Sequence, residues 1–284
     1  MGVTFFNNMK TAVLLGAMIA LFVVVGAALG EAYILPAFIL GVVMNVGAFL
    51  FSHKLAIAAM RGREVTAETG GDFYRMIERL SERAGLPMPR VYICPHQAPN
   101  AFATGPSPKK AAVAVTQGAL DLLEPFELEG VIAHELAHVK NRDTLISTIA
   151  ATIAGIFAML AQWMFFFMPF GMAGGDDEGG GALGGILVLL IGAVGAALLK
   201  AAISRSREFA ADADGASIAG TPDGLISALQ KLEAQAKRVP LRQPNPAMNN
   251  MFIVEPFAGQ SLAKLFASHP PTEDRVRALQ RAVD

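Results

Sequence analysis

The segment "VIAHELAHVKNRDTLISTIAATIAGIF", residues 131–157, joins two different kinds of sequence. Its first half is polar and carries His134, Glu135 and His138. Its second half, from Thr144, belongs to an uncharged run that continues to residue 175, which is more than the roughly 20 residues of a membrane-spanning helix. The pattern therefore predicts a metal-binding helix that leads directly into a membrane span.

The polar half has the residues of a zinc hydrolase. His134 and His138 are four residues apart, so they project from one helix face about one turn apart and can bind one Zn²⁺ ion. Zinc lowers the pKa of a bound water to about 7, and Glu135 is placed to take its proton. The alternative is a chance pattern on an amphipathic helix with solvated side chains.

A catalytic zinc site also requires a third protein ligand. The segment "SREFAADADGA", residues 206–216, supplies Glu208 as the candidate. Asp212, one turn later on the same face, can accept a hydrogen bond from the non-ligating nitrogen of a ligand histidine. On the residues alone, Glu208 is equally well a partner of Arg205 or Arg207 on a solvated face.

The composition favours a membrane protein. Of the 284 residues, 53% are hydrophobic and 17% are charged, against roughly 25% charged in soluble domains. The formal net charge of -1 gives no electrostatic argument for nucleic acid as a partner. The single cysteine, Cys94, excludes an internal disulfide, and its apolar surroundings favour a core position over a nucleophile.

Uncharged runs of sufficient length predict four membrane-spanning helices in two hairpins. The runs are residues 11–30, 32–52, 144–175 and 179–199. The first run has an alternative as a cleaved signal peptide, but its length and the second span that follows at once favour the hairpin.

Charges beside the spans predict the orientation. Acidic residues lie in the two short connectors, at Glu31 and at 176–178. Basic residues lie at the opposite ends of the spans: Lys10, Lys54, Arg61, Arg63, Lys140, Arg142, Lys200, Arg205 and Arg207. We therefore expect a multi-pass protein of the inner (cytoplasmic) membrane, with both termini and both polar segments in the cytoplasm.

The polar segments predict a mostly α domain with a small β-sheet. Helices are expected within 71–85, 125–143, 204–220, 222–238 and 272–283, and strands at "PRVYIC" (89–94) and "KAAVAVTQ" (110–117). Residues 95–109 between these strands are expected to be a turn-rich connection. Four segments follow: a membrane hairpin (1–52), a first polar part (53–143), a second hairpin (144–200) and a second polar part (201–284).

The strand "KAAVAVTQ" is also the candidate edge on which an extended substrate binds through main-chain hydrogen bonds. An ordinary core strand is an equally good interpretation. Residues 239–260, rich in proline and asparagine, are expected to form a loop.

The motifs "HELAH", "SREFAADADGA" and "SHPPTEDRV", in this order and with membrane spans around them, closely resemble the HtpX proteases of peptidase family M48, to which the CAAX prenyl proteases also belong. The resemblance covers nearly the whole chain, including "PNAFATG". It implies a zincin-like (gluzincin) protease domain, split by the second hairpin, with one Zn²⁺ per chain. It also implies cleavage of misfolded or damaged membrane proteins in the stress response and membrane quality control.

The same resemblance implies a role for each motif residue. His134, His138 and Glu208 match the zinc ligands, Glu135 matches the catalytic base, and Asp212 matches the acid that supports a ligand histidine.

Two further residues match positions around the cleft of such proteases. Asn100 in "PNAFA" matches an asparagine that lies beside the substrate strand. His269 in "SHPP" matches a histidine that reaches into the cleft, where it can stabilise the tetrahedral oxyanion. The resemblance implies no small-molecule cofactor.

Two rival functions are distinguishable. An intramembrane protease would carry its HExxH motif inside a span, but Glu127, Glu129 and Lys140 would be costly in hydrocarbon. A non-catalytic membrane scaffold or chaperone that retains a metal site is the alternative from another class. The variant Glu135→Gln separates that scaffold from an enzyme, since only an enzyme would lose its cellular role with the zinc still bound.

Overall fold

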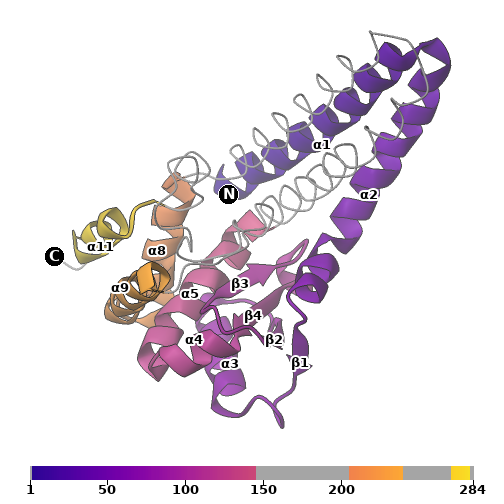
Figure 1. Ribbon diagram of the computed structural model, residues 1–284. Helices are drawn as coiled ribbons and strands as arrows, with labels where there is room; N and C mark the ends of the chain where they lie inside the picture. Colours follow the sequence, from indigo (N-terminus) through magenta and orange to yellow (C-terminus); the bar gives the residue numbers. More distant parts are fainter. Residues whose placement is uncertain (1, 145–204, 239–269, 282–284) are drawn as a thin grey trace.

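The computed structural model describes residues 2–144, 205–238 and 270–281. The described part is mostly helical with one small sheet, as the sequence predicts (Figure 1). Its α-helices are α1 (Gly2–Leu29), α2 (Ile34–Ala59), α3 (Gly71–Ala84), α4 (Gln117–Leu122), α5 (Pro125–Asn141), α8 (Arg205–Ala219), α9 (Asp223–Arg238) and α11 (Thr272–Arg281). Its strands are β1 (Arg63–Val65), β2 (Arg90–Cys94), β3 (Ala101–Thr104) and β4 (Ala112–Thr116), and short 3-10 helices lie at Glu31–Tyr33 and Pro108–Lys110.

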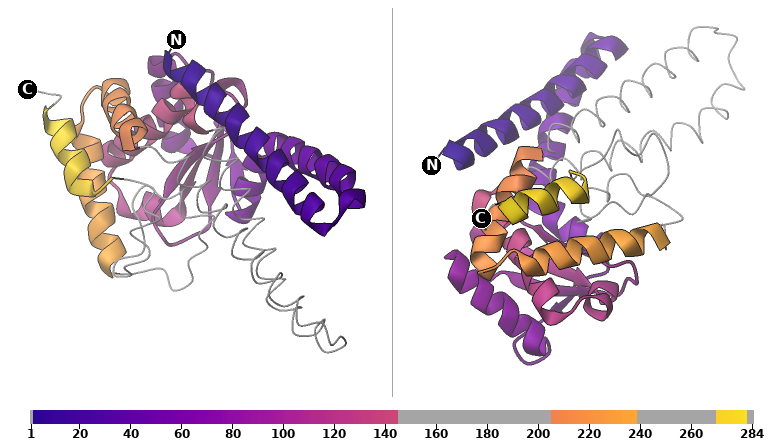
Figure 2. Two further views of the ribbon diagram at one scale, coloured as in Figure 1. Left: turned by 90° about the horizontal axis from the view of Figure 1, so that it is seen from above. Right: turned by 90° about the vertical axis from the view of Figure 1, so that its left-hand side faces the viewer.

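The first two helices form an antiparallel hairpin that projects away from the sheet (Figures 1 and 2). Asn45 Nδ2 of α2 donates a hydrogen bond of 2.9 Å to the Leu15 carbonyl oxygen of α1. The segment Glu31–Phe51 has a mean hydropathy of 2.3 and is long and apolar enough to cross a membrane, with only 12% of it buried. The apolar part of α1, Leu15–Val24, is shorter.

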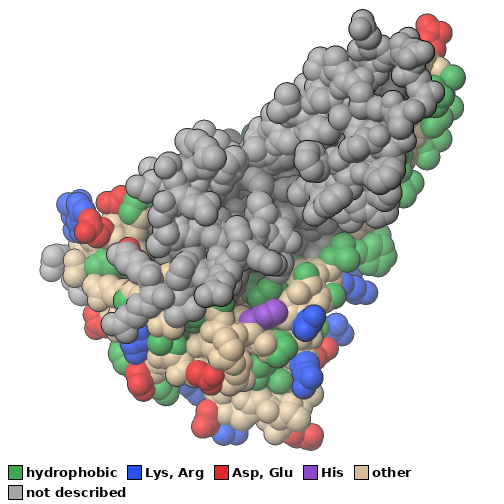
Figure 3. Space-filling model, in the orientation of Figure 1, with side chains coloured by type: hydrophobic (Ala, Val, Ile, Leu, Met, Phe, Trp, Pro, Cys, Tyr) green, Lys and Arg blue, Asp and Glu red, His purple; other side chains and the backbone are tan. Residues whose placement is uncertain are grey.

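The surface of the hairpin differs from the surface of the domain that contains the sheet. Hydrophobic side chains line the outer face of the hairpin, and charged side chains gather on the domain below it (Figure 3). The predicted third and fourth spans, and the predicted loop at 239–260, lie outside the described residues.

The sheet has the strand order β1-β2-β4-β3, in which β2 and β4 are parallel and the two outer strands are antiparallel to their neighbours. The side chains of β4 alternate between the two faces of the sheet. Val113 and Val115 face a core shared with α3 and α5, whereas Ala112 and Ala114 face Ile57 and the rest of the carboxyl-terminal end of α2.

The topology corrects the expected substrate edge. The strand predicted for that role, "KAAVAVTQ", forms β4, which is paired on both sides and therefore has no free edge. The edge on this side is β3, within the segment that the sequence analysis assigned to a turn-rich connection. Its four residues, Ala101–Thr104, are too short and too rich in small side chains to show a strand periodicity.

The lone cysteine lies in the core, as predicted. Cys94 is fully buried beside Phe102 and Ile57. Burial raises the pKa of its thiol to about 11, so the reactive thiolate is disfavoured at neutral pH.

Local sequence signals set the bounds of the central helix α5. Pro125 occupies its first turn, where a missing N–H costs nothing. Glu124 and Glu127 form a reciprocal capping box at this end. At the other end, Arg142 adopts a left-handed conformation with φ of 59° and terminates the helix. The expected ends of α3 and α8 are also found, because Gly85 and Gly220 have positive φ.

Helices α8 and α9 pack directly against α5. Glu127 of α5, 2% exposed, accepts hydrogen bonds from Ser227 Oγ (2.7 Å) and Lys231 Nζ (2.6 Å) of α9. Helix α11 in turn packs on α8 and α9. Residues 205–238 and 270–281, which are distant in sequence, are thereby brought against the helix that carries the two histidines.

Gly215 allows α8 to approach α5 at the histidine pair. A Cβ atom at this position would lie 2.8 Å from His134 Cα and 2.9 Å from its backbone nitrogen. We expect Gly215→Ala to push the helices apart and destabilise the chain by about 1–3 kcal/mol. Thermal unfolding in detergent measures the change. Gly47→Ala is the control, since nothing lies within 4 Å of its added Cβ, and equal effects of the two would contradict the prediction.

Candidate metal centre

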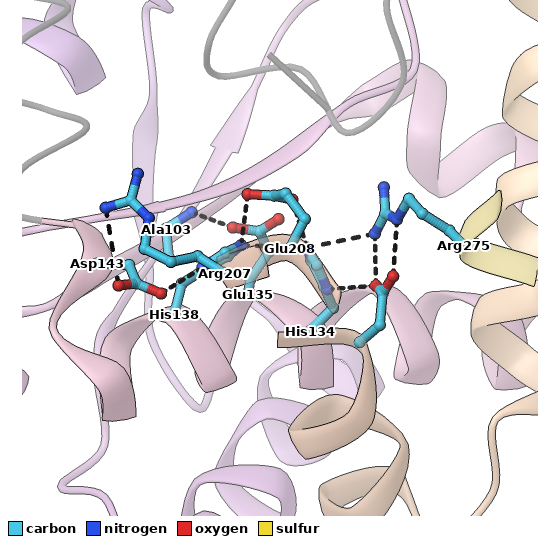
Figure 4. A network of polar contacts seen from close by, with 9 residues as sticks. Ala103, His134, Glu135, His138, Asp143, Arg207, Glu208 and Arg275 are labelled. Carbon is cyan, nitrogen blue, oxygen red and sulfur yellow. Dashed lines mark hydrogen bonds and ion pairs between the residues drawn. The ribbon is translucent and has the colours of Figure 1, made fainter. Parts of the chain in front are cut away.

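Three of the predicted site residues converge between α5 and α8 (Figure 4). The Nε2 atoms of His134 and His138 are 3.2 Å apart. Glu208 Oε2 lies 3.7 Å from the first of them, and Glu208 Oε1 lies 3.7 Å from the second. These ligand atoms all lie within 4.8 Å of one another. The α-helical period explains the histidine pair, but only the packing of α8 on α5 brings in the glutamate, 70 residues after His138 (208 − 138).

The geometry of the cluster fits a zinc ion. In a tetrahedral site with Zn–N bonds of about 2.0–2.1 Å, ligand atoms are separated by roughly 3.3 Å. The shortest separations here are 3.2 Å between the two Nε2 atoms and 3.7 Å from each Nε2 atom to one of the two Glu208 oxygens. The donor set of two imidazoles and one carboxylate leaves a fourth position open, as in a catalytic zinc site.

The acceptor atoms of the cluster also favour a bound cation. His134 Nδ1 lies 2.9 Å from the Asp212 carboxylate and His138 Nδ1 lies 3.2 Å from that of Asp143. When each Nδ1 carries the proton, both Nε2 lone pairs point at one place, together with the Glu208 oxygens. A cation bound at this place would relieve the repulsion between these acceptors.

The pKa of His138 also reflects the negative charge around the cluster. Burial disfavours the charged imidazole, but the surrounding carboxylates, Glu208 foremost, outweigh it and raise the pKa of His138 well above its usual value.

Asp212 lies where the sequence analysis expects it, beside a ligand histidine. Its carboxylate contacts His134 on one side and accepts two hydrogen bonds from Arg275 on the other, from Nε at 2.9 Å and from Nη2 at 2.6 Å. Asp212 and Arg275 are each 1% exposed. Burial would raise the pKa of Asp212, but the guanidinium and the imidazole lower it strongly, so the carboxylate stays charged.

Glu135 lies beside the cluster without belonging to it. Its Oε2 atom accepts a hydrogen bond of 2.8 Å from the backbone N–H of Ala103, on the edge strand β3 (Figure 4). This contact places a carboxylate between the histidine pair and the outer strand of the sheet. A peptide paired along β3 would therefore pass next to Glu135.

The two remaining predicted site residues have different outcomes. Asn100 directly precedes β3 and is 1% exposed, and its backbone exchanges hydrogen bonds with Thr116 of β4. Its role beside the substrate stays a prediction. His269 lies outside the described residues, so its role also stays a prediction.

Four groups of the site were missed by the sequence analysis: Arg275, Asp143, Arg207 and the Ala103 backbone. Arg275 and Arg207 read as ordinary charges in polar helices, and a backbone group has no sequence signal. Asp143 did offer a signal, because an acid five residues after His138 can reach back to it across the helix end.

Comparison with known proteins places this site in a family. The family described as "Peptidase family M48" matches residues 67–283. Proteins named "Protease HtpX homolog" are similar along their whole length: that of Syntrophobacter fumaroxidans is 45% identical, over 96% of this chain and 99% of the relative. Those of Desulfatibacillum aliphaticivorans (49% identical, 97% of this chain, 90% of the relative) and Thermococcus sibiricus (42%, 97% and 96%) are comparable.

A solved structure shares the fold. The crystal structure of S. mikatae Ste24p matches 98% of this chain and 67% of its own, with a TM-score of 0.52 and 18% sequence identity. At that identity the likeness concerns the fold alone.

Proposed function

Since the chain belongs to peptidase family M48, we propose that it is a membrane-bound zinc endopeptidase that hydrolyses peptide bonds of misfolded or damaged membrane proteins. The single observation that carries the proposal is the convergence of His134, His138 and Glu208, three acceptors aimed at one position beside Glu135. The proposed ion is one Zn²⁺ per chain, because its preferred ligands and geometry match this set.

Different residues have different roles in the proposed hydrolysis. Zinc, when bound, supplies a Lewis acid that makes water more acidic and polarises the scissile carbonyl group. His134, His138 and Glu208 hold the ion, and Asp212 keeps the His134 ring in the tautomer that presents Nε2. Glu135 takes the proton from the attacking water and passes it to the leaving amine.

The edge strand β3 orients the substrate in this proposal. Its register with β4 pairs Phe102 with Ala114 and Thr104 with Ala112. The backbone of Ala103 points to the other side, since its N–H donates to Glu135. An extended peptide that joins this edge would replace Glu135 as the acceptor of the Ala103 N–H, and its main chain would run alongside β3. Asn100, at the start of the strand, is proposed to contact the same peptide, and His269 to stabilise the oxyanion.

The proposed location is the inner membrane, with the metal centre and both termini on the cytoplasmic side. The apolar segment Glu31–Phe51 and the basic residues that follow it, Lys54, Arg61 and Arg63, support this orientation. Beside the membrane, the site would meet damaged proteins that still reside in the bilayer.

Removal of the metal tests the proposal. We expect the detergent-purified chain to cleave casein, and a chelator to lower the rate by at least about 100-fold, because a catalytic metal supplies several kcal/mol of transition-state stabilisation. One equivalent of Zn²⁺ should restore the rate. Glu208→Gln should need far more zinc for the same recovery. Casein cleavage that is indifferent to the chelator, or a folded zinc-loaded chain that cleaves neither casein nor an unfolded membrane protein, would contradict it.

A further inference from the structure

The two ligand histidines are oriented by two different carboxylates. Asp212 of α8 contacts His134, whereas Asp143, which directly follows the Arg142 cap of α5, contacts His138. Asp143 is 3% exposed, and its Oδ2 atom lies 3.2 Å from His138 Nδ1. A carboxylate at Nδ1 fixes the ring orientation and leaves Nε2 as the acceptor that faces the metal position.

Each carboxylate also has an arginine on its far side. Arg275 holds Asp212 with two hydrogen bonds, and Nη1 of Arg207 lies 3.9 Å from Asp143 Oδ1 (Figure 4). Arg207 is only 9% exposed, and its Nε and Nη1 atoms have no hydrogen-bond partner. A buried guanidinium of this kind is costly unless a negative charge lies close to it, and Asp143 supplies that charge. The Arg207–Asp143–His138 series thus parallels Arg275–Asp212–His134.

The Asp143–Arg207 pair also joins two helices that are distant in the sequence. Asp143 lies just after the end of α5, and Arg207 lies in the first turn of α8. Neighbouring contacts hold the end of α5: Asn141 Nδ2 donates to Asp214 Oδ2, farther along α8, at 2.7 Å, and Thr144 Oγ1 donates to the Gly105 carbonyl oxygen at 3.3 Å. The last turn of α5 and the first turn of α8 therefore meet at His138.

We propose that Asp143 is a positioning residue for the metal ligand His138, and that Arg207 holds Asp143 in place. This Arg207–Asp143–His138 relay makes the metal affinity of the centre depend on the packing of α8 against the end of α5. Because α8 carries both Arg207 and Glu208, one movement of this helix would weaken a ligand and the support of another ligand together. This inference rests on the proposed zinc site.

Zinc affinity of the full-length chain in detergent, measured by competition with a chromophoric chelator, tests the relay. We expect Asp143→Asn to bind zinc roughly 10–100-fold more weakly, the range for loss of an orienting partner. Arg207→Gln should bind several-fold more weakly, and the double variant no more weakly than Asp143→Asn alone. Arg207→Lys, which keeps the charge, should recover part of the loss. The control pair is Asp72→Asn and Arg75→Gln, an exposed ion pair of 2.6 Å away from the site, which should leave affinity unchanged.

A second readout separates orientation of the ligand from general stability. At full occupancy by Co²⁺, the visible absorption band of Asp143→Asn should shift, because the ligand field at His138 changes, whereas the control pair should leave it in place. Equal zinc affinity and an unshifted band in Asp143→Asn would overturn the relay alone. Independent, multiplicative effects of Asp143→Asn and Arg207→Gln would overturn the role of Arg207. A wild-type chain that binds no zinc would overturn both the relay and the proposed function.

Discussion

Replacement of Glu135 by glutamine is expected to lower the rate of peptide hydrolysis by roughly 10²–10⁴-fold, the contribution of a positioned general base. Glutamine has the same shape, and its amide oxygen can still accept the hydrogen bond from Ala103 N–H. It cannot take a proton from water. Since Glu135 is not one of the three clustered ligands, one zinc ion per chain should remain bound.

The measurement is casein cleavage by the detergent-purified variant, with metal content determined for the same sample. Glu129→Gln is the matched control, because it makes the same chemical change on the same helix, at a side chain that pairs with Arg83 at 3.6 Å. That control should keep its activity. Undiminished cleavage by Glu135→Gln would show that another group is the base. A variant without cleavage that keeps its full cellular role would favour the scaffold over the enzyme.

Replacement of Arg275 by methionine is expected to destabilise the chain by roughly 3–5 kcal/mol, because it leaves the carboxylate of Asp212 buried and unpaired. Both side chains of this ion pair are 1% exposed. The pair also fastens α11 to α8, and it holds the carboxylate that orients His134. We therefore expect weaker zinc binding along with the loss of stability.

Thermal unfolding in detergent, with and without zinc, measures the effect. Arg277→Met is the control, since this arginine lies on the same helix but is 61% exposed, and its ion pair with Glu273 should contribute little. Addition of Asp212→Asn to Arg275→Met should recover part of the lost stability, since it removes the unpaired charge. Similar unfolding temperatures for Arg275→Met and Arg277→Met would refute the assigned role of the buried pair.

Local patterns in the sequence were sufficient for most of the helices. The apolar spacing of Phe73, Met76, Ile77 and Leu80 predicted α3, and all four side chains are buried. Gly85 predicted its end and adopts the left-handed conformation that such an end requires. These signals lie within a few residues of one another, so they can be recognised without knowledge of the fold.

The strand at the edge shows where local patterns fail. Residues 101–104 have no alternation of their own, and they form a strand because β4 offers them hydrogen-bonding partners. The neighbouring "KAAVAVTQ" has a clear strand pattern, but the pattern does not say whether one side or both sides are paired. For this reason the sequence analysis placed the edge at β4, whereas the structure places it at β3.

The sequence by itself determined the two histidines on one helix face, the glutamate between them and the apolar hairpin at the amino terminus, because helical period and hydropathy are properties of neighbouring residues. Only the tertiary structure decided that β3 is the outer strand beside Glu135, and that Arg275 and Arg207 pair with the carboxylates that contact the histidines. Such contacts join residues that are distant in the chain. Their formation depends on the packing of α8 against α5 and of α11 against α8, which no local pattern encodes.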